Sequence, residues 1–138
     1  MTPTVQVERT ADEVTVTFTV FDRPWTTNLE RKGNRWVRSQ KTAEWRQLFG
    51  LLTKAQRLPC LCDATVEVRL LQKGRLQDVG ACNPAVKAAI DGMVDGGLLL
   101  DDDPENLHKL VFFSPQRAKF DQITLSITGK VRDDVNNG

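Results

Sequence analysis

A two-residue hydrophobic period constrains the fold of this chain more than any other feature. Residues 14–21, VTVTFTVF, alternate apolar side chains with threonine, and residues 64–72, ATVEVRLLQ, alternate in a similar way. Successive side chains of a β-strand point to opposite faces, so both segments predict strands that are buried on one face. A strand of this kind needs a second layer over its apolar face.

The segments after these two strands predict helices that could form that layer. Residues 39–57 carry apolar side chains at spacings of three and four, and Pro59 ends the segment. Asn83 and Pro84 favour the start of a second helix, which Gly96 and Gly97 end. The expected apolar stripe of the first helix is Ala43, Leu48, Leu51, Leu52 and Ala55, and that of the second is Val86, Ala89, Ile90, Met93 and Val94.

Two more apolar segments, residues 107–114 and 122–129, predict strands that pair as a hairpin. The order β-α-β-α-β-β then indicates the α+β class: a single two-layer domain with a mixed sheet of about four strands and two main helices. The 138 residues suit one such domain over residues 1–130, with a disordered tail at 131–138.

The composition favours a cytoplasmic protein. No run of 18 apolar residues predicts a membrane span, and the start of the chain, MTPTVQVERTADEV, has no signal-peptide pattern. Three cysteines, Cys60, Cys62 and Cys82, form no disulfide pattern, which is typical of a reducing compartment.

Charge is segregated along the chain although the net charge is only +1. Nine bases and two acids lie between positions 23 and 57, whereas seven acids and one base lie between positions 78 and 105. We expect the first segment to attract polyanions and the second to hold cations. Three tryptophans lie within the basic segment. Trp45 is expected in the core, while Trp25 and Trp36 could equally be core residues or stack on unpaired bases.

The acidic segment suggests a metal site. Asp78 precedes the second helix, and Asp101, Asp102 and Asp103 follow it. Mg²⁺ prefers oxygen ligands and usually takes one or two protein carboxylates. The two groups of acids can meet only if residues 98–100 double back beside the strand that leads to Asp78. The alternative is an acidic turn that is simply solvated.

Lys87 has no explanation in helix energetics. It lies in the first part of the second helix, where a cation opposes the macrodipole, and it precedes Asp91 in the less favourable order. A lysine near metal and phosphate could stabilise negative charge in a transition state. An ordinary surface lysine is an equal alternative.

Other chemistries have weaker signals. The single histidine, His108, lies in an apolar strand segment, which favours a structural role. Zinc binding by His108 with the three cysteines lacks a second paired motif. No phosphate-binding P-loop pattern is present, so no nucleotide cofactor is expected.

Two stretches resemble the RusA family of Holliday junction resolvases, in the form carried by phages and prophages of actinobacteria. They are RPWTTNLERKGNRWVRSQKTAEWR, residues 23–46, and DVGACNPAVKAAIDGMVDGGLLLDDD, residues 78–103. The first is similar to a Pro-x-x-x-Asn entry loop and the basic helix after it. The second is similar to the family signature of acids, a helix with a lysine, and paired aspartates. The resemblance covers roughly residues 18–129.

The resemblance implies a homodimeric endonuclease that depends on Mg²⁺, or on Mn²⁺ in its place, and cuts four-way or branched DNA by paired nicks in recombination and repair. By position, Asp78 and Asp102 are similar to the family's catalytic metal-binding acids and Lys87 to its essential lysine. Asp101 and Asp103 are the additional candidate metal ligands. The candidate DNA-binding residues are Asn28, Arg31, Lys32, Arg35, Arg38 and Lys41.

One position departs from the family pattern. The family commonly has Asp-x-Asp-Asn before the helix, whereas this chain has Asp78, Val79, Gly80 and Ala81. Gly80 therefore stands where a second acid is expected. Two alternatives to the nuclease follow: a non-catalytic protein that binds branched DNA with a degenerate metal site, and an interaction module with a solvated acidic turn.

Overall fold

The computed structural model describes residues 2–28 and 35–132. It contains the predicted α+β domain, with two main helices and a mixed sheet of six strands instead of about four. The predicted tail, residues 131–138, lies outside the described residues from position 133 onward. The elements in chain order are β1 (Thr4–Arg9), β2 (Val14–Val20), α2 (Arg35–Ala55), β3 (Leu61–Gln72), α3 (Asn83–Asp95), β4 (Leu107–Phe112), β5 (Gln116–Arg117) and β6 (Gln122–Val131).

The strand order differs from the predicted one at the end of the chain. The order in the sheet is β1-β2-β6-β3-β4, with β5 also paired to β3. β6 runs antiparallel to both β2 and β3, whereas β4 and β5 are parallel to β3. The predicted hairpin between residues 107–114 and 122–129 is therefore wrong, because β6 enters the middle of the sheet and β4 forms an edge. Local alternation predicts strands but does not specify their partners.

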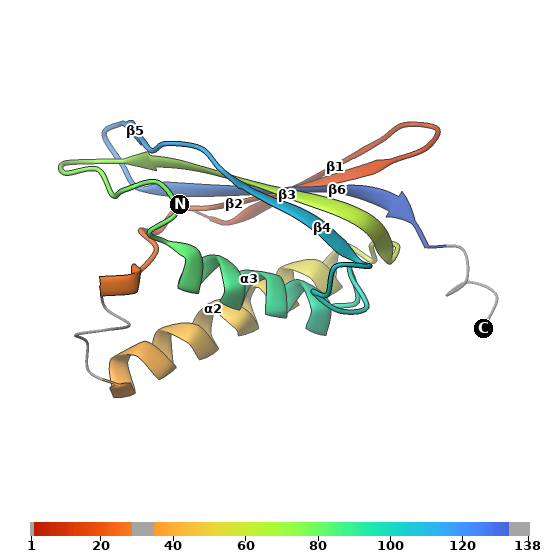
Figure 1. Cartoon of the computed structure of the whole chain (residues 1–138), viewed down its shortest axis with the longest axis horizontal. Coiled ribbons are helices and arrows are strands. Elements are labelled where there is room, and N and C mark those ends of the chain that lie inside the picture. Colours follow the sequence, from red (N-terminus) through yellow and green to blue (C-terminus); the bar gives the residue numbers. More distant parts are fainter. Residues whose placement is uncertain (1, 29–34, 133–138) are drawn as a thin grey trace.

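Both helices cover the same face of the sheet (Figure 1). The apolar side chains of the alternating strands point into this layer, and residues such as Phe18, Val66 and Ile127 are fully buried. The opposite face carries hydroxyl side chains, including Thr15 and Thr128, whose Oγ1 atoms are 2.8 Å apart. The two-residue period thus describes the two faces of the sheet correctly.

The predicted stripe of α2 is largely wrong, whereas that of α3 is confirmed. The buried residues of α2 are Trp45, Phe49, Gly50 and Thr53, while Leu51 is 59% exposed. Leu48 and Leu52 are half-buried against the core, whereas Ala43 and Ala55 are exposed like Leu51, because the helix turns two large aromatic side chains and two small residues inward instead. Of the expected α3 stripe, Val86, Ala89, Ile90 and Met93 are buried and Val94 is half-buried.

Glycines set the distance between the two helices. A Cβ atom added at Gly92 would lie 2.4 Å from the Arg46 carbonyl oxygen, and one at Gly96 would lie 2.6 Å from the Thr53 Cβ. A Cβ added at Gly50 would lie 3.4 Å from the Gly92 carbonyl oxygen, which is ordinary contact. The backbones therefore approach most closely at Gly92.

The tryptophans separate into two environments. Trp25 and Trp45 are buried and pack edge to face, with ring centroids 5.3 Å apart. The core assignment of Trp45 is confirmed, and Trp25 joins it. Trp36 is 69% exposed near the start of α2. No helix in the described part of the chain has the length and apolar character needed to span a membrane.

We expect Gly92→Ala to lower the free energy of unfolding by about 1–3 kcal/mol, since the new methyl group overpacks the helix contact. The matched control is Gly50→Ala, in the partner helix at the same contact. It should leave stability unchanged or raise it by up to about 1 kcal/mol, because alanine is the better helix former. Urea unfolding of both variants measures the difference, and equal effects would contradict the assigned close approach.

Candidate functional site

The chain after α3 turns back beside the start of β3. The Leu61 amide donates to the Leu98 carbonyl at 2.7 Å, and Leu99 forms an isolated parallel bridge with Leu61. Residues 98–100 therefore do turn back beside the strand that leads to Asp78, as the sequence required for the acids to meet, but they do so at the beginning of that strand. This reversal carries the following acidic turn, residues 101–103, back alongside α3.

Lys87 and Asp102 meet as a result of this turn. The Lys87 ammonium donates a hydrogen bond to Asp102 Oδ2, across 15 positions of sequence. The Lys87 side chain is 52% exposed and that of Asp102 is 27% exposed, so solvent reaches the pair. The Asp102 amide in turn donates to Asp101 Oδ1 at 2.8 Å. The predicted catalytic lysine and one predicted catalytic acid therefore lie in contact.

The contact keeps both groups charged. The hydrogen bond to Asp102 raises the pKa of Lys87 above its usual value, with further contributions from the charges of Asp102, Asp91 and Asp101. The same hydrogen bond from Lys87 lowers the pKa of Asp102. Lys87 is therefore a cation at neutral pH and cannot act as a general base there.

Asp103 has a structural role in the same turn. Its Oδ1 accepts hydrogen bonds from the Asn106 amide at 3.2 Å and from Asn106 Nδ2 at 2.7 Å. Asn106 is only 4% exposed, and its Oδ1 accepts a 2.6 Å hydrogen bond from Arg132 Nη1. These bonds fix the turn between Asp102 and β4.

Asp78 begins a tight turn in the loop between β3 and α3. The Ala81 amide donates to the Asp78 carbonyl at 3.1 Å, and Gly80 has a φ of +80°. A positive φ at the third position of a turn is typical of type II and favours glycine. Gly80, which replaces an expected acid, thus has a conformational role. A Cβ there would meet nothing within 4 Å, so a side chain has room.

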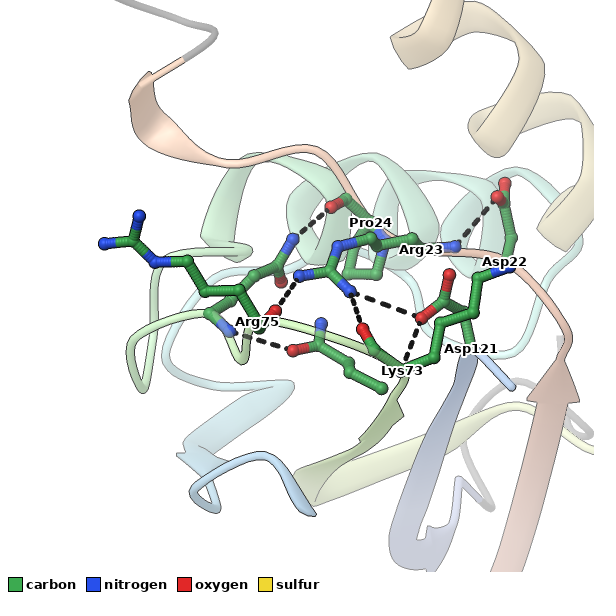
Figure 2. A network of polar contacts seen from close by, with 8 residues as sticks. Asp22, Arg23, Pro24, Lys73, Arg75 and Asp121 are labelled. Carbon is green, nitrogen blue, oxygen red and sulfur yellow. Dashed lines mark hydrogen bonds and ion pairs between the residues drawn. The ribbon is translucent and has the colours of Figure 1, made fainter. Parts of the chain in front are cut away.

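Arg23 holds this loop in place (Figure 2). Its Nη1 donates to the Lys73 carbonyl at 3.1 Å and to Asp121 Oδ1 at 3.3 Å, and its Nη2 donates to the Arg75 carbonyl. Asp121 Oδ1 also accepts the Lys73 amide at 3.1 Å. One side chain therefore joins three loops. In the sequence Arg23 is one of nine bases in the basic segment, and no local pattern indicates this role.

Further hydrogen bonds, from side chains and backbone, join the segment after Arg23 to the same loop. Gln77 Nε2 donates to the Pro24 carbonyl at 2.8 Å, and the Gln77 amide donates to Gln72 Oε1 at 2.9 Å. The Thr27 amide donates to the Ala81 carbonyl at 3.0 Å. Residues 23–28 and the Asp78 loop thus form the two sides of a polar groove of about 420 Å³.

The predicted metal ligands do not come together as a shell of four acids. Among residues 2–28 and 35–132, no group of three or more His, Cys, Asp or Glu side chains is close enough to hold a metal ion. Asp78 lines the groove, Asp102 contacts Lys87, and Asp103 binds Asn106. The arrangement fits an Mg²⁺ site with few protein ligands. One or two carboxylates, such as Asp101 and Asp102, would bind the ion, and water and phosphate would supply its other ligands.

The predicted DNA-binding residues that the structure describes lie in the groove and along the first half of α2. Asn28 lines the groove with Asp78. Arg35 and Lys41 are exposed on α2, and Arg38 is half-buried there. Arg31 and Lys32 lie outside the described residues.

The remaining titratable candidates are not arranged as a metal site. Burial raises the pKa of the Cys82 thiol to about 11, so it remains protonated at neutral pH. His108 Nε2 lies 3.2 Å from Asp63 Oδ1 on the surface of β4.

Comparison with known proteins adds no relative: no family model and no curated protein matches this chain.

Replacing Lys87 by Met should lower the free energy of unfolding near pH 7 by less than about 1 kcal/mol, because the pair is exposed. The lowered pKa of Asp102 makes its contribution present above the unfolded value of 3.8 and lost as pH falls through the folded value. The raised pKa of Lys87 makes its contribution present below 10.5 and lost as pH rises through the folded value.

Chemical unfolding of Lys87→Met and the parent at pH 3, 7 and 11 tests this. The difference between them should be largest at pH 7 and shrink at both extremes. A difference that grows at pH 3 would contradict the assigned ion pair.

Proposed function

We propose that this protein is an Mg²⁺-dependent endonuclease of the RusA type, which acts in the cytoplasm as a homodimer and resolves four-way or branched DNA by paired nicks. The observation that supports this most is the contact between Lys87 and Asp102. It places a permanent cation among carboxylates at the surface, in the two positions where the family resemblance predicts a catalytic lysine and a catalytic acid. An exposed ion pair of this kind adds little to stability, so catalysis gives it a reason that folding does not.

The residues have separate roles in this proposal. Asp101 and Asp102 would hold Mg²⁺, which when bound supplies an activated water and offsets the charge of the phosphate. Lys87 holds Asp102 in position, and its ammonium stabilises negative charge that develops on the phosphate oxygens. Since Lys87 remains protonated, it acts through charge and not as a base. Asp78 lies in the groove, apart from Asp101 and Asp102, so it would not share this ion with them.

The start of α2 would bind the DNA arms. Arg35 and Lys41 are exposed there, and Trp36 is exposed next to Arg35. Lysine and arginine neutralise phosphates without reading sequence, so this binding should be salt-dependent and directed by DNA shape. Two copies related by a two-fold axis would present two such sites to a symmetric junction.

A second candidate is a branched-DNA-binding protein without nuclease activity. Its support is the turn at Gly80, where glycine meets a backbone requirement in place of a ligand, and the separation of Asp78 from the acidic turn. It shares the DNA-binding surface with the nuclease and differs only in catalysis.

Nicking of a synthetic four-way junction separates the two candidates. With Mg²⁺ the parent should cleave, and Lys87→Met and Asp102→Asn should each reduce the single-turnover rate at least about 100-fold, as the loss of an electrostatic catalytic group does. The control is Arg46→Gln, which breaks another exposed ion pair, that of Arg46 Nε with Asp95 Oδ2 at 2.7 Å. It should cleave at the parental rate.

The outcomes assign the function. Cleavage that persists in EDTA rejects the metal-dependent mechanism, and cleavage that survives both substitutions rejects the roles given to Lys87 and Asp102. Junction binding without cleavage in either Mg²⁺ or Mn²⁺ selects the second candidate.

The variant Gly80→Asp tests whether the acid that the family pattern places at position 80 is needed for metal binding. Aspartate tolerates a positive φ better than most residues, so the expected loss of stability is about 1 kcal/mol. If a second carboxylate limits metal binding, the variant should need less Mg²⁺ for half-maximal cleavage. Gly74→Asp, at another glycine with a positive φ (+69°) and open space around it, is the matched control and should leave the Mg²⁺ requirement unchanged.

A further inference from the structure

The groove beside Asp78 has walls that are fixed before any ligand binds. One wall is the segment 23–28, and the other is the loop 75–81. Arg23 bonds to the loop backbone at Lys73 and Arg75, and the Thr27 amide bonds to the Ala81 carbonyl. A groove closed by its own hydrogen bonds can position a ligand at little cost in ordering.

The two arginines of the groove differ in what their charges face. Arg23 points into the network of Figure 2, where Asp121 and two carbonyls surround its guanidinium. Arg75 contributes only its carbonyl to this network, and Figure 2 shows its side chain extending away from it. Within the described residues, the Arg75 guanidinium forms no hydrogen bond or ion pair. Arg23 therefore builds the groove, and Arg75 offers it a positive charge.

The groove also holds neutral donors and one acid. The side chains of Thr26, Thr27 and Asn28 line one side, and Asp78 lines the other. Asp78 forms no ion pair with Arg75 or with any other described residue. The groove thus contains a positive charge at Arg75 and a negative charge at Asp78 that do not form an ion pair with each other.

We propose that this groove binds one phosphate of the DNA strand through the Arg75 guanidinium and the hydroxyl groups of Thr26 and Thr27. The inference rests on the proposed function, because it takes DNA as the ligand. The planar fork of arginine matches phosphate oxygens in pairs, and threonine hydroxyls are common donors to the DNA backbone. Asp78 lies beside this phosphate and repels it when no cation is bound between them.

Junction binding in EDTA, measured over a range of salt concentrations, tests this site without relying on cleavage. Arg75→Gln should weaken binding about 5- to 10-fold. It should also reduce the slope of log K against log salt by about 0.7–0.9, the change expected for one lost phosphate contact. Thr26→Val combined with Thr27→Val should weaken binding two- to threefold with an unchanged slope, because no charge is lost.

Asp78→Asn gives an effect of opposite sign in the same assay. Removal of the carboxylate charge should strengthen binding in EDTA. The charge control is Arg9→Gln: Arg9 is exposed and pairs with Val14, at the far end of β2 from Arg23. Its affinity and salt slope should equal those of the parent. Circular dichroism of each variant confirms that it is folded.

The outcomes separate this site from the proposed function. If the parent binds the junction but Arg75→Gln retains its affinity and slope, the groove does not bind phosphate and the nuclease proposal stands. An equal loss in Arg9→Gln would show only a general effect of charge and would also overturn the site. If the parent does not prefer branched DNA to duplex, the proposed function fails and the groove inference fails with it.

Discussion

The close contact between α2 and α3 is the interaction on which the rest of the structure depends. Gly92 lets the α3 backbone approach the Arg46 carbonyl to a distance that no Cβ atom would permit. The two helices can therefore lie together on one face of the sheet (Figure 1). This places the basic start of α2 and the Lys87 turn of α3 in one rigid layer, since packed backbones leave little room for adjustment. Both candidate functional surfaces belong to that layer.

A second constraint connects this layer to the end of the sheet. Trp45 in α2 donates through Nε1 to Asp22 Oδ2 at 3.3 Å, and Asp22 Oδ1 accepts the Arg23 amide at 2.8 Å. Arg23 then binds the loop that carries Asp78. A side chain of the helix core is thus linked through Asp22 and Arg23 to the loop that carries a candidate site acid. Hydrogen bonds to charged groups are stronger than neutral ones, which suits them to fixing loops that lack an apolar core of their own.

The acidic segment divides into groups with different tasks. Asp103 organises its own turn through Asn106, and Asp95 binds Arg46 across the helix contact. Asp102 faces Lys87, and Asp78 faces the groove. Asp78 and Asp102, with the exposed Asp101 beside Asp102, are therefore the acids that solvent reaches at a candidate site. A count of carboxylates along the sequence makes these acids equivalent, whereas their hydrogen-bond partners distinguish them.

The sequence by itself determined both main helices and four of the six strands, the buried faces of β2 and β3, and most of the buried face of α3, but it did not indicate β1 or β5. These features depend on local periodicity, which the order of residues contains directly. It also singled out Lys87, Asp78 and Asp102 and exposed the absence of an acid at Gly80. On α2 the sequence indicated Trp45 as a core residue, and the expected stripe left out the fully buried Phe49. Gly50 and Thr53 could not be predicted, because they are buried by their fit to α3 and not by their hydrophobicity.

Tertiary structure alone decided the pairing of β6 with β2 and β3, the meeting of Lys87 with Asp102, and the role of Arg23. Each joins residues that are distant in the chain: Lys87 and Asp102 are 15 positions apart, and Arg23 and Asp121 are 98 apart. Such contacts depend on how the strands are ordered and where the loops end. Local sequence preferences determine the elements, but the global packing of the apolar faces determines which polar groups become neighbours.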